Sequence, residues 1–278
     1  MKRWDLHVHT TASDGMMTPE DVVYLAREAG LSGIALTDHD TVEGVERAKA
    51  EGEKRGIDVI AGVEVSTLAN GQDIHVLGYF MDVHDSRLLS RLKGQREVRQ
   101  KRNGLVVERL RQLGVDIRLE EVLAKKREDG TNVGRPHIAE VLIEKGVVNS
   151  MDEAFDRFLG KDGKAYVTTP RLTPKDAIGL IREAGGVPVL AHPGLYGDDW
   201  LVCRLAESGL AGIEVRHPDH DQEMEQRYRD IAAKHQLIGT AGSDFHGERH
   251  GSMYHAPLGT CTVEGSVVEQ LQNRRKPT

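Results

Sequence analysis

The sequence predicts an α/β fold in which a parallel, TIM-like barrel is interrupted by a helical insertion. Short apolar runs alternate with amphipathic helical stretches at both ends of the chain, a pattern typical of parallel strands joined by helices. Between residues 83 and 162 this alternation stops and only helical spacing remains. We therefore expect a barrel domain formed by residues 1–82 and 163–278, and an insertion domain, residues 83–162, that covers the substrate-binding face of the barrel.

The N-terminal part of the barrel should contain four strands and two helices. Thr18 is a suitable N-cap, Pro19 suits the first helical position, and Gly30 suits the end of this helix. The second helix should run from about residue 42 to 55. The strands are expected at residues 3–9, 33–38, 58–65 and 73–79.

The predicted insertion is helical throughout. Leucines recur at helical spacing from Leu88 to Leu113, and no alternating pattern indicates a strand. Three shorter helices are expected at residues 119–127, 135–145 and 151–159.

The C-terminal part resumes the alternation of strands and helices. Thr173 and Pro174 begin a helix that should end near Gly185. The remaining helices are expected at residues 199–208, 221–235 and 265–273, and the strands at 187–192, 212–215, 237–242 and 259–263. The whole chain then has six or seven strand–helix units, fewer than the eight of a regular (β/α)₈ barrel.

The charge distribution separates the insertion from the rest of the chain. Residues 85–135 contain 14 Lys or Arg against 8 Asp or Glu, whereas the other residues contain 23 against 36. An acidic body with a basic segment fits a metal-binding carboxylate site that meets an anionic ligand. A solvated helical face would produce the same segment, and both readings stay open. No basic tract is long enough to predict binding to duplex DNA.

The composition predicts a cytoplasmic protein that makes no membrane contact. The sequence has no apolar run long enough to span a bilayer and no signal-like segment. Its two cysteines, Cys203 and Cys261, belong to no Cys-x-x-Cys motif. We expect both to be small buried apolar residues. Nothing in the sequence predicts an obligate protein partner.

Histidines and carboxylates follow the strands in a pattern typical of a metal site. His7 and His9 alternate on one strand, so their side chains point to the same face. Strand ends converge on one face of an α/β barrel. Histidine and carboxylate without cysteine favour Zn²⁺, Mn²⁺ or Fe²⁺. The number of candidates suits two or three ions, provided that Glu64 bridges; they are His7, His9, Asp14, His39, Glu64, His75, His192, Asp244 and His246.

These residues stand in four motifs that resemble those of the PHP superfamily, named for polymerase and histidinol phosphatase domains. The motifs are His7-Val8-His9, Thr37-Asp38-His39-Asp40, Ala191-His192-Pro193 and Ser243-Asp244-Phe245-His246. The resemblance implies a distorted seven-stranded (β/α)₇ barrel with a trinuclear metal centre. It also implies three ligand sets: His7, His9, Glu64 and Asp244; Glu64, His75 and His192; Asp14, His39 and His246.

The chemistry of such a centre suggests roles for nearby residues. A hydroxide held between two metals would attack phosphorus directly, so no protein nucleophile is needed. We expect Asp38 and Asp40 to support histidine ligands. His217 and His220 could protonate the leaving group or bind phosphate, or could be ordinary loop histidines. No pattern assigns a role to the remaining histidines His84, His235, His250 and His255.

Basic residues of the insertion are candidates for binding a second phosphate away from the metals. Arg99, Arg102 and Asn103 share one predicted helix, and Arg135 and His137 begin another. Guanidinium groups bind phosphate in a bidentate manner. The segment from Arg135 to His137 also resembles the branch of the superfamily that contains nucleoside 3′,5′-bisphosphate phosphatases and RNA 5′-end nucleases.

The sequence therefore supports one main function and two alternatives. The main prediction is a phosphoesterase that acts on small nucleotides, such as a nucleoside 3′,5′-bisphosphate, or on 5′-phosphorylated RNA ends. The first alternative is a histidinol-phosphate phosphatase with the same metal centre, although a substrate with one phosphate needs less positive charge. The second alternative is a non-catalytic, metal-stabilised PHP scaffold, which substituted ligands would favour.

Overall fold

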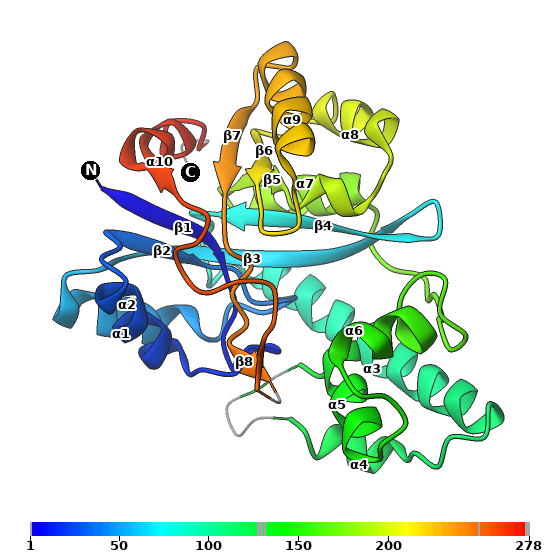
Figure 1. The fold of residues 1–278 in the computed structure, drawn as a ribbon. Helices are drawn as coiled ribbons and strands as arrows, with labels where there is room; N and C mark the ends of the chain where they lie inside the picture. The colour runs from blue at the N-terminus through cyan, green and yellow to red at the C-terminus, as the bar shows by residue number, and fades with distance from the viewer. Residues whose placement is uncertain (1, 127–129, 131, 250, 276–278) are drawn as a thin grey trace.

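A computed structural model describes residues 2–126, 130, 132–249 and 251–275 of the chain. Eight strands form one sheet that curls into a nearly closed barrel (Figure 1). Its strand order is β10-β1-β2-β3-β4-β5-β6-β7. The strands are β1 (Arg3–Val8), β2 (Gly33–Leu36), β3 (Asp58–Ala69), β4 (Gln72–Tyr79), β5 (Val187–Leu190), β6 (Gly212–Arg216), β7 (Ile238–Ala241) and β10 (Val263–Glu264). The predicted fold class, a distorted α/β barrel with a helical insertion, is confirmed.

The barrel closes where β1 meets the segment that follows β7. Val8 forms a parallel bridge with Phe245, and the amide of His9 donates a 2.9 Å hydrogen bond to the Phe245 carbonyl. Gly242 lies directly against His7, so closely that an added Cβ would stand 2.2 Å from the His7 Cβ. β1 and the segment after β7 therefore hold each other at the point where both carry candidate metal ligands.

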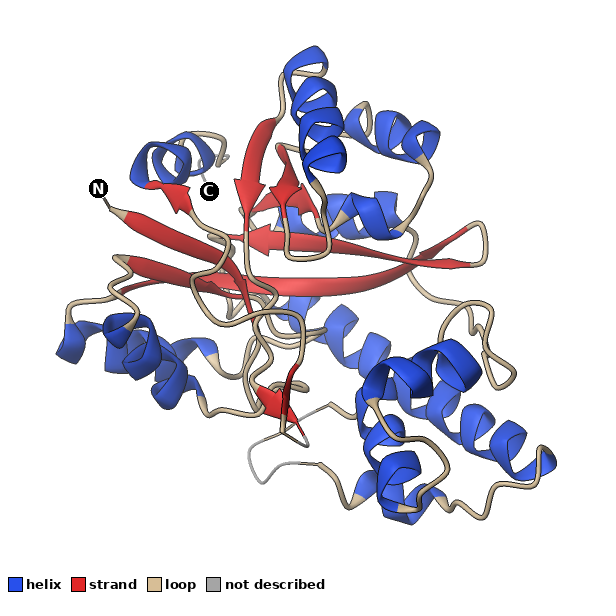
Figure 2. Cartoon of the chain, in the orientation of Figure 1, coloured by secondary structure: helices blue, strands red, loops and turns tan. Residues whose placement is uncertain are grey.

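Helices cover the outside of the barrel (Figure 2). Thr18 caps the first of them by accepting a hydrogen bond from the amide of Asp21, as its position before Pro19 predicted. Val22 and Val23 on this helix lie in the main apolar core. The covering helices are α1 (Pro19–Glu28), α2 (Val45–Arg55), α7 (Pro174–Glu183), α8 (Asp199–Ala206), α9 (Gln222–Lys234) and α10 (Gly265–Gln272). Among the described residues, no helix is both long and apolar enough to cross a membrane.

The expectation of parallel pairing throughout is wrong for β4. Asn70 and Gly71 form a tight turn with φ values of 52° and 73°, so β3 and β4 form an antiparallel hairpin. A turn of this length cannot make the crossover that parallel strands need. β4 also pairs antiparallel with β5. The start of β4, rather than its end, therefore lies where the parallel strands end.

Two smaller differences lie near the C-terminus. The strand expected at residues 259–263 is shorter and later, and it pairs antiparallel with β1. The sequence analysis also missed a short hairpin of β8 (Glu248–Arg249) and β9 (Ser252–Met253).

The insertion has an apolar core of its own. Leu88 and Leu92 of α3 pack into the barrel core, whereas Val106 and Leu110 of the same helix pack into the insertion core. The described residues between Ser86 and Leu159 form no strand. The helices are α3 (Ser86–Gln112), α4 (Leu119–Leu123), α5 (Arg135–Glu144), α6 (Met151–Ala154) and a π-helical turn, Phe155–Leu159. The helix expected at 119–127 ends at Leu123, and residue 127 lies outside the described residues.

Substitution of Gly242 by alanine tests the barrel closure. We expect Gly242→Ala to destabilise the protein by about 2–3 kcal/mol, because overpacking at this contact forces backbone to move. The added methyl group would also lie 2.6 Å from the His7 amide nitrogen. Urea denaturation measures the change. Gly179→Ala is the control, since open space surrounds Gly179 in α7, and a helical alanine should stabilise by about 0.5–1 kcal/mol. An unchanged midpoint for Gly242→Ala would contradict the described closure.

Candidate metal centre and anion pocket

Four buried side chains meet where β1 and β3 pass the segment after β7. The Nε2 atom of His7 lies 3.4 Å from Glu64 Oε2 and 3.3 Å from Asp244 Oδ1. The Nε2 atom of His9 lies 3.2 Å and 3.1 Å from the same two oxygens. Their donor atoms lie close enough together to hold one metal ion.

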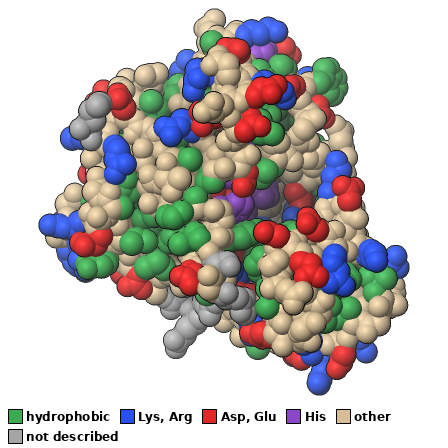
Figure 3. Space-filling view, viewed as in Figure 1, with side chains coloured by type: hydrophobic (Ala, Val, Ile, Leu, Met, Phe, Trp, Pro, Cys, Tyr) green, Lys and Arg blue, Asp and Glu red, His purple; other side chains and the backbone are tan. Residues whose placement is uncertain are grey.

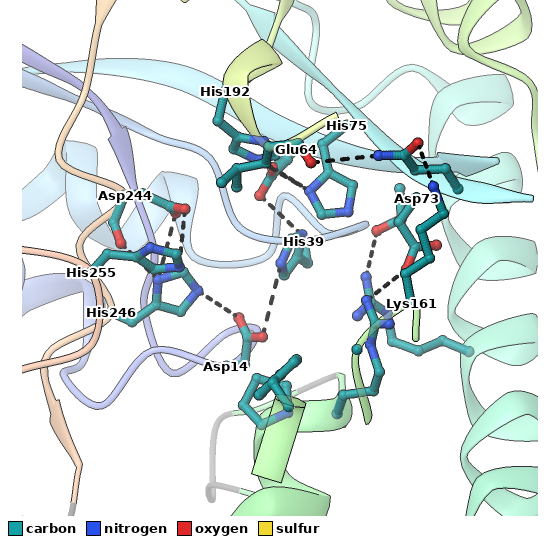
Figure 4. Close-up of a pocket in the computed structure, with 18 of the residues that line it drawn as sticks. Asp14, His39, Glu64, Asp73, His75, Lys161, His192, Asp244, His246 and His255 are labelled. Atoms are coloured by element: carbon teal, nitrogen blue, oxygen red, sulfur yellow. Dashed lines mark hydrogen bonds and ion pairs between the residues drawn. The ribbon is translucent and has the colours of Figure 1, made fainter. Parts of the chain in front are cut away.

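The other oxygen of Glu64 faces two more histidines (Figure 4). Glu64 Oε1 lies 2.8 Å from His75 Nδ1 and 3.1 Å from His192 Nε2. His75 is near the start of β4, and it reaches this face because β4 runs antiparallel to its neighbours. The carboxylate of Glu64 therefore separates two groups of imidazoles, as a bridging ligand would.

A third group forms around Asp14. Asp14 Oδ1 lies 3.4 Å from His246 Nε2 and 3.8 Å from His9 Nδ1. Asp14 Oδ2 lies 3.9 Å from His39 Nε2, while His39 Nδ1 lies 3.0 Å from Glu64 Oε2. All nine residues expected to bind metal are thus brought together by the fold.

The donor atoms of these groups fit divalent cations. Burying a polar atom without a hydrogen bond is costly, and a cation coordinated by imidazole and carboxylate would remove that cost. The absence of cysteine from the groups fits a site with catalytic rather than structural chemistry. The described residues provide no hydrogen-bond partner for His7 Nε2, His9 Nδ1, His9 Nε2, Asp14 Oδ1, His39 Nδ1, His192 Nδ1 and Asp244 Oδ1.

The electrostatics of the centre keep its carboxylates charged and favour a proton on the imidazoles of His7 and His9. Burial opposes ionisation of Glu64, yet His39, His75 and His7 hold the pKa of its carboxyl well below the ordinary value. Burial also opposes a charge on His9, but Asp244 and Glu64 raise the pKa of its imidazole to about 10. A metal ion would have to displace such protons, since it binds the neutral imidazole.

Glu214 supports the centre from beneath, and the sequence analysis missed it. This fully buried carboxylate on β6 lies 3.2 Å from His7 Nδ1 and accepts a 2.8 Å hydrogen bond from the amide of His192. A carboxylate on the far nitrogen fixes the orientation of a histidine ligand. The available signal was a glutamate within an otherwise apolar strand.

The expectation that Asp38 and Asp40 support histidine ligands is wrong. Asp38 accepts a 2.6 Å hydrogen bond from the hydroxyl of Ser13 and so holds the loop that carries Asp14. Asp40 forms a 2.9 Å ion pair with Arg99 of the insertion. Each aspartate therefore stabilises backbone or insertion contacts around the centre.

Backbone strain is concentrated at this face. Asp40, His192, Asp244 and His255 have positive φ values of 53°, 21°, 49° and 57°. Such conformations cost non-glycine residues on the order of 1–3 kcal/mol each and persist where the surrounding structure enforces them. Here they turn the side chains of His192, Asp244 and His255 toward the centre and that of Asp40 toward Arg99.

The catalytic role suggested for His220 conflicts with its contacts. Its Nδ1 donates a 2.9 Å hydrogen bond to the Val215 carbonyl, and its Nε2 accepts a 3.1 Å hydrogen bond from the Gly194 amide. With both ring nitrogens bound to backbone, His220 ties two loops together and has no proton available for a substrate.

His217 and His255 both orient Asp244. The Nε2 atom of each lies 3.3 Å from Asp244 Oδ2, which leaves Oδ1 facing His7 and His9. His255 also lines the cavity and lies 3.0 Å from Asp219 Oδ2. No sequence motif marked His255, because only the loop conformation brings it here. His84 and His235 do not line the cavity, and His250 lies outside the described residues.

A cavity of about 330 Å³ lies beside the centre, between the barrel and the insertion. Figure 3 shows histidines exposed in this hollow. Asp73 Oδ2 accepts a 2.6 Å hydrogen bond from Arg135, and Asp73 Oδ1 accepts one from Arg171. The cationic side chains that line the cavity are Arg99, Arg102, Arg135, Lys161 and Arg171.

Arg102 is the least satisfied of these cations. Its side chain is 2% exposed, and its Nε and one terminal nitrogen have no hydrogen-bond partner among the described residues. Burial, together with Arg135 and Arg99, lowers the pKa of Arg102 well below its ordinary value. A guanidinium group does not lose its proton in proteins. An anion bound in the cavity would instead compensate the buried positive charge of Arg102.

Other predicted contacts in the insertion are not supported. Asn103 is fully buried, and its side chain donates a 2.7 Å hydrogen bond to the Val133 carbonyl. His137 Nδ1 accepts a 3.1 Å hydrogen bond from the Gly134 amide within the cap of α5. Neither residue lines the cavity. Arg171 does line it, although no pattern in the sequence had marked this residue.

Comparison with known proteins agrees with this geometry. The PHP domain family matches residues 5–145. The chain is 36% identical over 250 residues to the 5′-3′ exoribonuclease Rnm of Escherichia coli, covering 87% of this chain and 85% of the relative. It is 32% identical over 262 residues to the 3′,5′-nucleoside bisphosphate phosphatase of Chromobacterium violaceum, covering 90% of each. A solved structure from Bifidobacterium adolescentis, assigned as a metal-dependent phosphoesterase, has a TM-score of 0.88 and 33% identity, covering 99% of this chain and 96% of the other.

Metal binding should release protons. At about pH 7.5 the His9 imidazole, with its pKa raised to about 10, is protonated in the metal-free protein. Its proton must leave when a cation binds, so affinity for Mn²⁺ should rise as the pH is raised from about 6 to 8. Titration calorimetry in two buffers with different ionisation enthalpies measures the number released. Equal heats in both buffers would contradict the described electrostatics.

Proposed function

We propose a substrate for this chain, which belongs to the PHP domain family. Its metal-dependent phosphoesterase centre acts on a nucleotide with two phosphate groups. One observation carries the choice of substrate. The buried guanidinium of Arg102, two of whose nitrogens have no hydrogen-bond partner among the described residues, lines the same cavity as seven of the candidate metal ligands. A ligand that satisfies both needs one phosphate at the metals and a second anionic group at the arginines.

The metal ligands proposed are the nine residues predicted from the sequence. Bound divalent cations would supply an acidified water and would neutralise charge on the phosphoryl oxygens. Glu64 is the proposed bridging ligand, because its two oxygens face different imidazole groups. The three sets are His7, His9, Glu64 and Asp244; Glu64, His75 and His192; Asp14, His39 and His246.

The residues of the cavity would hold the second phosphate. Arg102 offers free donors, and Arg135 and Arg171 already bind one carboxylate, Asp73, through its two oxygens. Guanidinium groups that bind a carboxylate in this manner also bind phosphate. Lys161 adds a further positive charge at the cavity. These side chains would fix the distance between the reacting phosphate and the second phosphate.

This arrangement suits one nucleoside that carries a phosphate at its 5′ position and another at its 3′ position. The E. coli and C. violaceum relatives are named for RNA degradation from the 5′ end and for 3′,5′-nucleoside bisphosphate hydrolysis. In both reactions a 5′-phosphate could bind in the arginine pocket, the part of the cavity lined by Arg102, Arg135 and Arg171, while the 3′-phosphate ester binds at the metals. A nucleoside 3′,5′-bisphosphate or a 5′-phosphorylated RNA end is therefore the proposed substrate.

The two alternatives fit the cavity less well. Histidinol phosphate carries one phosphate, so it would leave Arg102 without an anion. A non-catalytic scaffold would not need an unsatisfied cation facing a cavity next to a complete set of donors. A phosphoesterase that binds both phosphates of its substrate thus accounts for more of the described contacts than either alternative does.

The bridging role of Glu64 can be tested by metal content. Protein loaded with Mn²⁺ should carry two to three ions per chain, and Glu64→Gln should lose at least one of them together with turnover. The substitution removes the charge that faces both imidazole groups but keeps the side-chain volume. Elemental analysis gives the metal content, and circular dichroism checks the fold. Asp244→Asn should behave in the same way. A folded Glu64→Gln variant with a full metal content would overturn the ligand assignment.

The role of Arg102 can be tested by substrate comparison. Arg102→Met should reduce kcat/KM for a nucleoside 3′,5′-bisphosphate by roughly ten- to a hundred-fold, since one charge-assisted contact contributes ~1.5–3 kcal/mol. Hydrolysis of p-nitrophenyl phosphate, which has no second phosphate, should hardly change. Arg111→Met, an exposed position on the same helix, is the matched control. An equal loss on both substrates would mean that Arg102 serves the fold or the metals.

A further inference from the structure

Arg249 connects the insertion to the loop that carries Asp14. Its side chain, on β8, is 2% exposed. One terminal nitrogen lies 2.5 Å from Glu140 Oε1, and the other donates a hydrogen bond to the backbone carbonyl of Asp14. Glu140, on α5 of the insertion, is itself only 4% exposed. A single buried ion pair thus joins one candidate metal ligand to a helix of the other core.

The same part of the insertion also contributes to the arginine pocket and contacts a second candidate metal ligand, His39. Helix α5 begins at Arg135, which binds Asp73 at the cavity. Just before it, the Asn132 side chain donates a 2.9 Å hydrogen bond to the carbonyl of His39. Gly134 lies next to Asp14, since an added Cβ would stand in van der Waals contact, 3.6 Å from Asp14 Oδ2. The segment from residue 132 to 140 therefore contacts both the pocket and the group of Asp14, His39 and His246.

The other two groups rest more directly on the barrel. Glu64 and His75 lie within strands β3 and β4, and His7 lies within β1. The sheet hydrogen bonds hold these side chains whatever the insertion does. Asp14 lies in the loop after β1. His39 lies beyond β2, where one parallel bridge to Glu64 and the hydrogen bond from Asn132 of the insertion hold it.

We infer that the Arg249–Glu140 pair couples the third proposed metal site, formed by Asp14, His39 and His246, to the arginine pocket. This inference rests on the proposed function. Metal at Asp14, His39 and His246 holds the docked insertion, and the docked insertion places Arg135 at the pocket. Each ligand then strengthens the binding of the other, because coupling between two sites is reciprocal. Removing one partner of a buried ion pair leaves a charge uncompensated, so the link is sensitive to single substitutions.

The test uses Glu140→Gln in the full-length chain, with Glu144→Gln as the matched control. Glu144 lies on the same helix but pairs with Lys125 at a half-exposed position. Equilibrium dialysis against Mn²⁺ should show one ion fewer per chain for Glu140→Gln than for the control. Its KM for a nucleoside 3′,5′-bisphosphate should rise about ten-fold, within the usual range of such couplings. Added Mn²⁺ should restore the KM, which a general structural defect would not allow.

A second measurement does not depend on the variant reaching full activity. Adenosine 5′-monophosphate should raise the Mn²⁺ affinity of the weakest site in the wild-type and Glu144→Gln proteins, and do so much less in Glu140→Gln. Equal metal content and equal KM for the two variants would overturn the coupling. Loss of all metal together with the circular dichroism signal would overturn it too, by making the pair a general support of the fold. Failure of the proposed function would appear differently, as absence of turnover by the wild type, while dialysis still reads the metal count.

Discussion

The Glu64 carboxylate is the contact on which the rest of the site depends. It is 1% exposed, and imidazole nitrogens lie within 3.4 Å of its oxygens on both sides. Without this charge, His75 and His192 would lose the carboxylate that faces them, and burial alone disfavours imidazolium. The contact also depends on the antiparallel pairing of β4. Because β4 runs antiparallel beside β3, His75, near its start, meets Glu64.

The sequence was sufficient for residues whose position follows from strand periodicity. His7 and His9 share a face because they alternate, and Asp244 and His246 follow a strand end. Residues that depend on tertiary contacts could not be assigned in this way. Glu214 and His255 reach the centre only through packing and loop conformation. Conversely, Asn103, His137 and His220 have suitable chemistry but bind backbone groups that no sequence pattern reveals.

The basic residues of the insertion fall into two classes, one buried at the cavity and one exposed to solvent. Arg99 and Arg102 are buried at the cavity, at 7% and 2% exposure, whereas Lys101 between them faces solvent. This follows from helical geometry, because positions three apart share a face and the position between them does not. A count of charges cannot separate these classes. The orientation of α3 against the barrel decides which arginines become part of a site.

Helix α3 also explains how metal chemistry and ligand selection can be divided between two cores. Its first turns pack into the barrel through Leu88 and Leu92, and its later turns pack into the insertion through Val106 and Leu110. Arg99 and Arg102 lie between these two contacts, at the junction of the cores. Three of the nine candidate metal ligands, His7, Glu64 and His75, lie within strands of the barrel. Changes in the insertion can therefore alter the cationic lining of the cavity while the strands keep these three side chains in place.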